Sequence, residues 1–301
     1  MRLAVAALAL AVFVPAAAAG SRVVSPGPVT ALAFDGTRLA FASGRSRNDC
    51  DRVRIWNLRS GRVVALGRTT ACVETSTGTG IAALSIAGPR VLWLHYTGGN
   101  IREWSLFTAS EGAPRPRRLR FVARSADSPG PIVLGEGDSH GRVLLPYAVD
   151  RQVVALRADA TGAFSWTAPE LVTALGARGD MLAVGLADGR IVVHDLTHGT
   201  SSEMVEPGAP SAVFVSASGI VAQRGRTVEL RGRATYTATL PRGAIVRDAD
   251  GLRVLYTVSG RVKELDFAAG TTRDVARGGF AQLESQSVAT AAGRVVRVDV
   301  P

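Results

Sequence analysis

Short apolar runs separated by glycine turns repeat along the chain, and the clearest example lies between Val172 and Thr200. Three runs occur there, and the second and third end at turn residues, Asp188-Gly189 and His198-Gly199. Runs of this length bounded by Gly and Asp are typical of antiparallel strands joined by tight turns. The stretch therefore predicts a meander of β-strands, and no helical period of useful length appears beyond the N-terminal segment.

Similar groups of runs recur about every 35 to 50 residues, a spacing typical of propeller blades. The groups begin near Val29, Ile81, Pro131, Val172, Ser211, Ala244 and Phe280. The last group contains only three runs, whereas Arg22–Val24 is a spare run near the N-terminus. A single small sheet cannot bury its own faces, so each needs neighbours, and a closed ring leaves no sheet at an end. We therefore predict an all-β, seven-bladed β-propeller in which the N-terminal strand completes the last blade; six or eight blades fit less well.

Several segments resemble repeats of known propellers. The segment ALAFDGTRLAFASG (31–44) is similar to the turn between the first two strands of WD40-like and TolB-type repeats, and DRVRIWNL (51–58) and DGRIVVHDL (188–196) resemble their third strand. No Trp-Asp dipeptide occurs, and its expected places are taken by Trp56-Asn57, Trp104-Ser105 and His194-Asp195. The resemblance is to secreted bacterial repeat proteins. It implies the architecture rather than an activity, because propellers host both binding modules and enzymes.

The first residues have the pattern of an export signal. Met1-Arg2 is followed by the apolar stretch Leu3–Val14, then by Pro15 and the small residues Ala17–Ala19. This pattern predicts a signal peptide over residues 1–19 and a single propeller domain over residues 20–301. An uncleaved membrane anchor is the alternative. No later stretch is long and apolar enough to span a bilayer, so we expect a protein that is secreted, periplasmic or associated with the cell envelope and not stably inserted in a membrane.

Two cysteines, Cys50 and Cys72, follow the signal segment. An even number of cysteines in an exported chain predicts a disulfide. In the expected propeller, Cys50 lies in a turn between second and third strands and Cys72 in a connection between blades. Both kinds of loop share one rim, which places the two thiols within reach of each other. Two unpaired thiols are the alternative.

The chain is basic, with 35 Lys and Arg against 25 Asp and Glu and a net charge of +10. Lys263 is the only lysine, and the arginines are spread over the whole chain, which disfavours nucleic-acid binding. A polar residue recurs at the start of each expected third strand: Arg52, Asn100, Gln152, Arg190, Arg226, Arg261 and Arg294. These arginines form either a ring that binds an anionic partner through bidentate contacts, or ordinary solvated turns of an arginine-rich protein.

Catalytic motifs are mostly absent: the chain contains no GxSxG, HExxH or CxxC sequence. Asp138-Ser139-His140 lies in a tight turn, where a catalytic triad rarely forms. His140 and His198 would share the rim opposite the cysteines, but further ligands would be needed for a metal. We predict no catalytic residue, no metal and no cofactor. The four tryptophans are expected to pack between blades: Trp56, Trp93, Trp104 and Trp166.

We therefore expect a monomeric binding scaffold whose loop rim engages a protein or an anionic envelope partner. The alternative is a propeller enzyme, such as a lactonase, a lyase or a glycan-acting hydrolase, with its site at the mouth of the central channel. An enzyme of this kind should have several convergent acids or histidines with shifted pKa values at the channel. A scaffold should have exposed apolar and arginine side chains on a flat surface.

Overall fold

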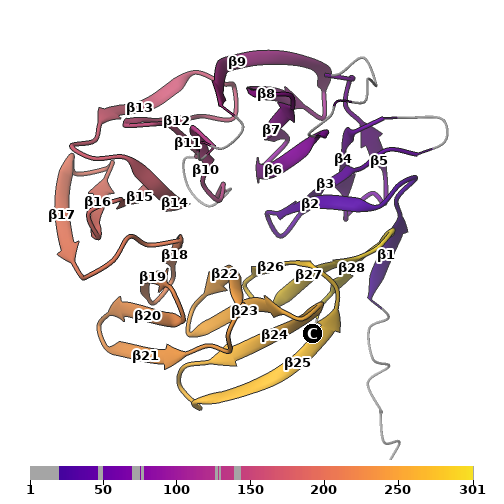
Figure 1. Ribbon diagram of the computed structural model, residues 1–301. Helices are drawn as coiled ribbons and strands as arrows, with labels where there is room; N and C mark the ends of the chain where they lie inside the picture. Colours follow the sequence, from indigo (N-terminus) through magenta and orange to yellow (C-terminus); the bar gives the residue numbers. More distant parts are fainter. Residues whose placement is uncertain are drawn as a thin grey trace, which may run out of the picture.

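The computed structural model describes residues 20–46, 50–69, 75, 78–125, 128, 130–138 and 144–300. Within these ranges the chain forms seven four-stranded antiparallel sheets, arranged as blades around a central channel (Figure 1). The predicted fold, an all-β seven-bladed propeller, is confirmed. The predicted signal segment, residues 1–19, lies outside the described residues. No helix in the described part of the chain has the length and apolar character needed to cross a membrane.

The blades follow the chain order, and in each the first strand lines the channel (Figure 1). Blade 1 contains β2 (Val29–Phe34), β3 (Arg38–Ser43), β4 (Arg52–Asn57) and β5 (Val63–Ala65). Blade 2 contains β6 (Thr79–Ala87), β7 (Arg90–Thr97), β8 (Ile101–Ser110) and β9 (Ala113–Ser125). Blade 3 contains β10 (Ile132–Leu134), β11 (Leu145–Val149), β12 (Gln152–Leu156) and β13 (Gly162–Thr167). Blade 4 contains β14 (Val172–Arg178), β15 (Met181–Leu186), β16 (Arg190–Asp195) and β17 (Thr200–Val205).

The remaining blades have the same order. Blade 5 contains β18 (Ala212–Ser216), β19 (Gly219–Arg224), β20 (Thr227–Gly232) and β21 (Thr235–Thr239). Blade 6 contains β22 (Ile245–Asp250), β23 (Arg253–Val258), β24 (Arg261–Asp266) and β25 (Thr271–Arg277). Blade 7 contains β26 (Phe280–Glu284), β27 (Ser287–Ala292), β28 (Val295–Asp299) and, from the other end of the described chain, β1 (Ser21–Val24).

Strand β1 closes the ring. It pairs antiparallel with β28, and Arg22 faces Arg297 while Val23 faces Val296. The outer strand of blade 7 therefore comes from the N-terminal side of the chain, while the three inner strands come from the C-terminal side. This is the closure that the spare N-terminal run predicted.

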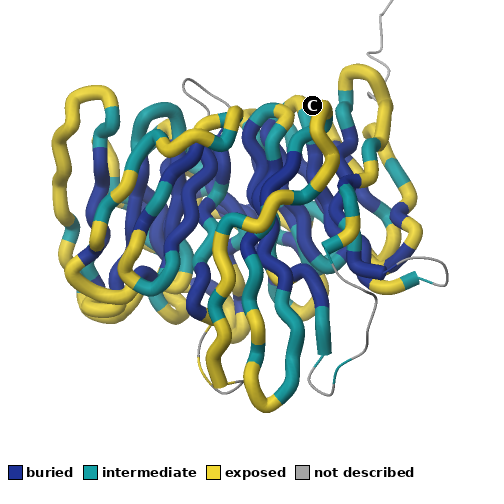
Figure 2. Tube along the Cα trace, turned by 90° about the horizontal axis from the view of Figure 1, so that it is seen from above, coloured by how far each residue is buried: buried dark blue, intermediate teal, exposed yellow. Residues whose placement is uncertain are grey.

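The core lies between the blades, where the inner three strands of neighbouring sheets pack face to face. Buried residues occupy the middle of the inner strands, and the loops at both ends and the outermost strands are largely exposed (Figure 2). One cluster joins blades 1 and 2 through Val53, Ile55, Leu66 and Trp93, and equivalent clusters join the other blades. Each blade buries its faces on two neighbours, so the ring is needed for any blade to be stable.

Glycine permits the closest approach of two blades. A Cβ atom built on Gly176 of β14 would lie 2.6 Å from the carbonyl oxygen of Val213 and 2.9 Å from the Cα of Phe214 in β18. Only a residue without a side chain fits there. Among the described residues, glycine with a positive φ occurs in the turn between the first and second strands of four blades, and in blade 4 Gly179 has a φ of 57°, a conformation that glycine adopts without strain.

Candidate functional site

The predicted arginine series lies at the start of the third strands, as expected from the sequence. Arg52, Arg190 and Arg261 are the first residues of β4, β16 and β24, and Arg226 and Arg294 precede β20 and β28. The third strand is separated from the channel by two inner strands, so these residues are distributed around the perimeter rather than at the channel mouth.

Most of these guanidinium groups contact their own blade. Arg190 pairs with Asp188 at 2.7 Å and Arg261 with Asp274 at 3.2 Å. Arg226 donates to the carbonyl oxygen of Leu240 at 3.0 Å, and Arg294 to that of Ser25 at 2.9 Å. These arginines thus tie the third strand to an adjacent turn or to the outer strand, and their binding of an anionic partner stays a prediction.

The other sequence-based assignments have mixed outcomes. Cys50 is 3 % exposed, but Cys72 lies outside the described residues, so the disulfide stays a prediction. Ser139 and His140 also lie outside them. His198 is an exposed turn residue bonded to Asp195, whereas His194 is buried against Phe164 and Trp166. Burial lowers the pKa of His194, as expected for a packed histidine. The four tryptophans belong to clusters packed between blades, which confirms that prediction.

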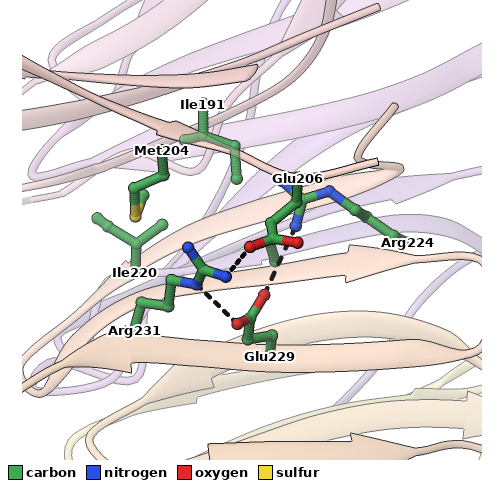
Figure 3. Close-up of a pocket in the computed structure, with 8 residues that line it drawn as sticks. Ile191, Met204, Glu206, Ile220, Arg224, Glu229 and Arg231 are labelled. Atoms are coloured by element: carbon green, nitrogen blue, oxygen red, sulfur yellow. Dashed lines mark hydrogen bonds and ion pairs between the residues drawn. The ribbon is translucent and has the colours of Figure 1, made fainter. Parts of the chain in front are cut away.

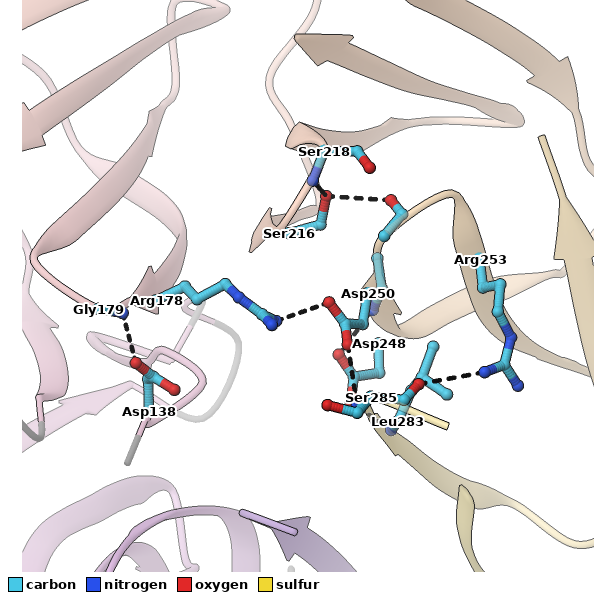
Figure 4. A network of polar contacts seen from close by, with 12 residues as sticks. Asp138, Arg178, Gly179, Ser216, Ser218, Asp248, Asp250, Arg253, Leu283 and Ser285 are labelled. Atoms are coloured by element: carbon cyan, nitrogen blue, oxygen red, sulfur yellow. Dashed lines mark hydrogen bonds and ion pairs between the residues drawn. The ribbon is translucent and has the colours of Figure 1, made fainter. Parts of the chain in front are cut away.

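Acidic side chains converge at one end of the channel, where the first strands of the blades end (Figure 4). Most of them accept hydrogen bonds from backbone N–H groups of the next blade. Asp138 accepts from Gly179, Asp250 accepts from Ser285 at 2.8 Å, and Asp248 accepts from Leu283 at 2.6 Å. Further from this end, Gln282 accepts from Phe34 at 2.9 Å across the junction between blades 7 and 1. These side chains therefore hold neighbouring blades together through hydrogen bonds to the backbone.

Two contacts cross the channel itself. Arg178 of blade 4 forms an ion pair with Asp250 of blade 6 at 2.6 Å, passing blade 5 where the equivalent residue is the small Ser216 (Figure 4). Glu136 of blade 3 hydrogen-bonds Asp248 of blade 6. The end of the channel is therefore bridged by polar side chains.

The Glu136–Asp248 pair shares a proton. Burial raises the pKa of Asp248 to about 6, although hydrogen bonds from Glu136, Leu283 and Ala249 oppose this effect. Burial raises the pKa of Glu136 well above its ordinary value, and the nearby negative charges of Asp248, Glu284 and Asp138 add to the effect. Their hydrogen bond raises the pKa of Glu136 and lowers that of Asp248, so Glu136 is the partner that holds the proton more tightly and donates it to the Asp248 carboxylate.

Convergent acids with raised pKa values are the feature that the enzyme alternative predicts. Here, however, Asp138, Asp248 and Asp250 are already bonded to backbone amides, and Arg178 and Glu136 are bonded to acids on the opposite side. A substrate would have to displace contacts that join the blades. The geometry therefore favours a structural role for these acids.

A second polar cluster lies between blades 4 and 5 (Figure 3). Arg231 contacts Glu206 of blade 4 and pairs with Glu229 at 2.6 Å, and Arg224 donates to the carbonyl oxygens of Gly189 and Gly208, each at 3.1 Å. The cavity enclosed by these residues and their apolar neighbours has a volume of about 10 Å³, which is room for a single water. This cluster joins two blades and leaves no space for a larger ligand.

The outer strand of blade 2, β9, differs from the other six outer strands. It has 13 residues with five arginines and no acid. The others have three to seven residues and at most two arginines. In Figure 1, β9 arches along the outside of blade 2. Its free edge is paired with no strand of the described part of the chain, apart from one hydrogen bond of 2.8 Å from the Gly67 N–H to the Pro114 carbonyl.

The arginines of β9 carry positive charge that the described residues do not neutralise. All five are exposed, and among the described residues an ion-pair partner is found for Arg124 alone, namely Asp150. The remaining four form no ion pair with described residues: Arg115, Arg117, Arg118 and Arg120. Burial lowers the pKa of Arg90 in the neighbouring β7, and the charge of Arg117 lowers it further. The electrostatic field along this surface is therefore strongly positive.

An open groove of about 550 Å³ runs beside β9, between blades 2 and 3. Leu119 and Arg120 form its wall on β9, and blade 3 contributes Tyr147, Leu156 and Ser165 among others. The Arg120 guanidinium lies over the Tyr147 ring, 5.7 Å from its centroid, and donates to the Leu119 carbonyl at 2.9 Å. On the opposite face of β9, Phe121 is 48 % exposed beneath the guanidinium of Arg118. Apolar surface and exposed arginines thus occur together on β9, as expected for a binding scaffold.

The sequence contained a signal for this surface that the analysis by strand position missed. Residues 115–120 read RPRRLR, with four arginines in six positions, and no acid occurs between Glu111 and Asp127. The even spread of arginines over the whole chain hides this run.

Comparisons with known proteins show the fold. No protein-family model and no curated protein matches the chain. The WD40 repeats of RRP9 align with 92 % of the chain and 96 % of that chain, at 12 % identity and a TM-score of 0.60. A chain from the mitotic checkpoint complex aligns with 100 % of this chain and 99 % of its own, at 15 % identity and a TM-score of 0.58. Raptor of Chaetomium thermophilum aligns with 93 % of this chain but 29 % of its own, at 14 % identity and a TM-score of 0.54.

The protein therefore has a WD40-like seven-bladed propeller fold. Because the sequences of these structures are only 12 to 15 % identical to this chain, the comparisons show the fold and not the function. None of these comparisons supports the bacterial origin suggested by the sequence resemblance, which stays a prediction.

Proposed function

We propose that this protein is an exported, monomeric binding scaffold that engages an acidic segment of a partner protein, in the cell envelope or outside the cell, through strand β9. The observation that carries the proposal is the set of four exposed arginines on β9 that form no ion pair with any described residue. Export rests on the sequence pattern of residues 1–19. The likeness to a propeller from a mitotic checkpoint complex, which is an assembly of proteins, is consistent with a scaffold.

The composition of β9 selects the type of partner. Five like charges disfavour pairing of this edge with a second copy of itself. Pro114 and Pro116 lack the N–H needed for pairing, and bulges interrupt the ladder with β8. Carboxylate groups, by contrast, form charge-assisted and often bidentate bonds with guanidinium groups. An acidic polypeptide therefore satisfies the charges that the strand leaves unpaired.

The test is binding of a fluorescein-labelled peptide of alternating glutamate and serine, measured by fluorescence anisotropy. The variant R117Q/R118Q/R120Q removes three unpaired charges from β9. The matched control R190Q/R226Q/R261Q removes three charges from the predicted arginine series. Exposed charge pairs contribute about 0.2–1 kcal/mol each, so we expect the β9 variant to weaken binding about tenfold and the control to change it little.

Binding should also weaken as ionic strength rises to about 0.5 M, because exposed charges are screened. No binding to the wild-type protein would contradict the proposal. Equal loss in both variants would instead indicate a dependence on net charge alone, and a larger loss in the control would favour the arginine series as the binding surface.

A further inference from the structure

The groove beside β9 has the size and chemistry of a receptor for one large apolar side chain. Its lining includes Leu119 on β9 and Tyr147, Val154 and Leu156 on blade 3. Its volume of about 550 Å³ exceeds that of any single side chain, and one arginine of β9, Arg120, forms part of its lining. Tyr147 and Leu156 are buried by residues around them, so the floor of the groove is fixed by the core cluster that joins blades 2 and 3.

The two walls of the groove, on β9 and β13, each contain a bulge in the strand ladder. The register between β8 and β9 shifts between Leu106 and Phe107, which makes room for Leu119 as an additional residue. The register between β12 and β13 shifts between Ala155 and Leu156. Such bulges bend a strand locally, and here they lie on the two walls of the same groove.

Arg120 places a charge at the edge of the apolar lining. Its stacking on Tyr147 and its bond to the Leu119 carbonyl hold the guanidinium in one orientation. A guanidinium carries five N–H donors, and one of its donors is used in this bond. A carboxylate adjacent to the apolar side chain of a ligand would meet the remaining donors.

We propose that the groove between blades 2 and 3 binds a large apolar side chain, leucine or an aromatic residue, flanked by acidic residues in a partner segment that lies along β9. This inference rests on the proposed function, because the acidic flanks require the arginines of β9. It adds a specificity: an acidic segment with an apolar anchor binds more tightly than an acidic segment without one. A nucleic acid would satisfy the charges but offers no such side chain, and it serves as an outcome of the test.

The experiment compares two peptides of alternating glutamate and serine, one with the central serine replaced by leucine and one with it replaced by alanine. The leucine peptide should bind about tenfold more tightly, which corresponds to about 1.4 kcal/mol. On the protein side, Ser165→Phe fills the groove from an exposed position of β13. Thr237→Phe is the matched control at an exposed position of β21, another outer strand.

With S165F the leucine peptide should bind no better than the alanine peptide, whereas T237F should keep the tenfold difference. Circular dichroism and thermal unfolding are used to check that both variants fold. The comparison of the two peptides on the wild-type protein does not depend on any variant. Equal binding of both peptides, still dependent on Arg117, Arg118 and Arg120, would overturn the groove while leaving the proposed function intact. Absence of binding by either peptide overturns both proposals. A single-stranded oligonucleotide that binds as tightly as the leucine peptide overturns the choice of partner.

Discussion

The carboxyl group of Asp248 should make the free energy of unfolding fall as the pH rises from about 4 to about 6. Its side chain is 1 % exposed, and burial raises its pKa in the folded protein to about 6, against about 3.9 in an unfolded chain. Between these two values the folded state binds the proton that the unfolded state has released. Stability is therefore lost as the pH rises through this window.

The size of the effect follows from the shift. About two pKa units at 1.36 kcal/mol each correspond to about 3 kcal/mol between pH 4 and pH 7. Asp248→Asn removes the ionisation while keeping the size of the side chain. Relative to the wild type, we therefore expect this variant to gain about 3 kcal/mol between pH 4 and pH 7. At pH 4 it should be somewhat less stable, because its amide N–H group faces one of the backbone donors, Leu283 or Ala249.

The assay is urea unfolding followed by tryptophan fluorescence at a series of pH values, with both proteins in the same buffers. Glu136→Gln should also gain stability relative to the wild type as the pH rises. Its amide N–H can replace the donated proton of Glu136, and an amide does not lose this proton at higher pH. Asp274→Asn is a control whose stability relative to the wild type should change with pH in the opposite direction, and at a pH below about 4. The hydrogen bond from Lys263 lowers the pKa of Asp274, so its ionisation favours the folded state as the pH rises. A stability difference between D248N and the wild type that is constant with pH would refute the reasoning.

Three further predictions concern the closure of the ring and its cross-links. Gln223 is 4 % exposed; it donates to the Ala244 carbonyl at 2.9 Å and accepts from the Val246 N–H at 2.8 Å in the next blade. Gln223→Leu should therefore lower the free energy of unfolding by about 3 kcal/mol. The control Gln152→Leu, at an exposed position, should change it by less than about 0.5 kcal/mol. A chain that begins at residue 25 lacks the ladder between β1 and β28 and should lose about 2–4 kcal/mol in chemical unfolding; unchanged stability would show that β1 does not close the ring. Mass spectrometry after alkylation in denaturant should find Cys50 and Cys72 modified only after reduction, and alkylation without reduction would exclude the disulfide.

The sequence predicts the ring because its information is local and repeated. Each strand is a short apolar run bounded by turn residues, and the spare run 22–24 matched the missing strand of the last blade, so the pairing of β1 with β28 followed from counting. The outer strands were less clear, because they are half exposed and their pattern is weak. The sequence predicts the fourth strand of blade 2 at Arg117–Ala123, and in the structure this run is part of a longer strand, Ala113–Ser125. The prolines at 114 and 116 are tolerated there because β9 is the outer strand of its sheet.

The polar clusters could not be predicted in the same way. Glu136 and Asp248 are 112 positions apart in the chain, on blades 3 and 6, and only the closed ring brings them together. The arginine run of β9 was visible in the sequence, but its lack of acidic partners is a property of three-dimensional packing. The arginines at the third strands were found by their spacing, whereas their contacts to Leu240, Asp274 and Ser25 depend on which strand lies beside them.

Hydrogen–deuterium exchange, measured by mass spectrometry with and without the leucine peptide, tests most directly whether a partner binds at β9. Binding there predicts slower exchange in residues 117–125 of β9 and 162–165 of β13, because the peptide covers both walls of the groove. Exchange should be unchanged around Arg190, Arg226 and Arg261 on the other blades. Protection confined to those three positions, with none in β9, would contradict the proposal and would place the binding surface on the predicted arginine series.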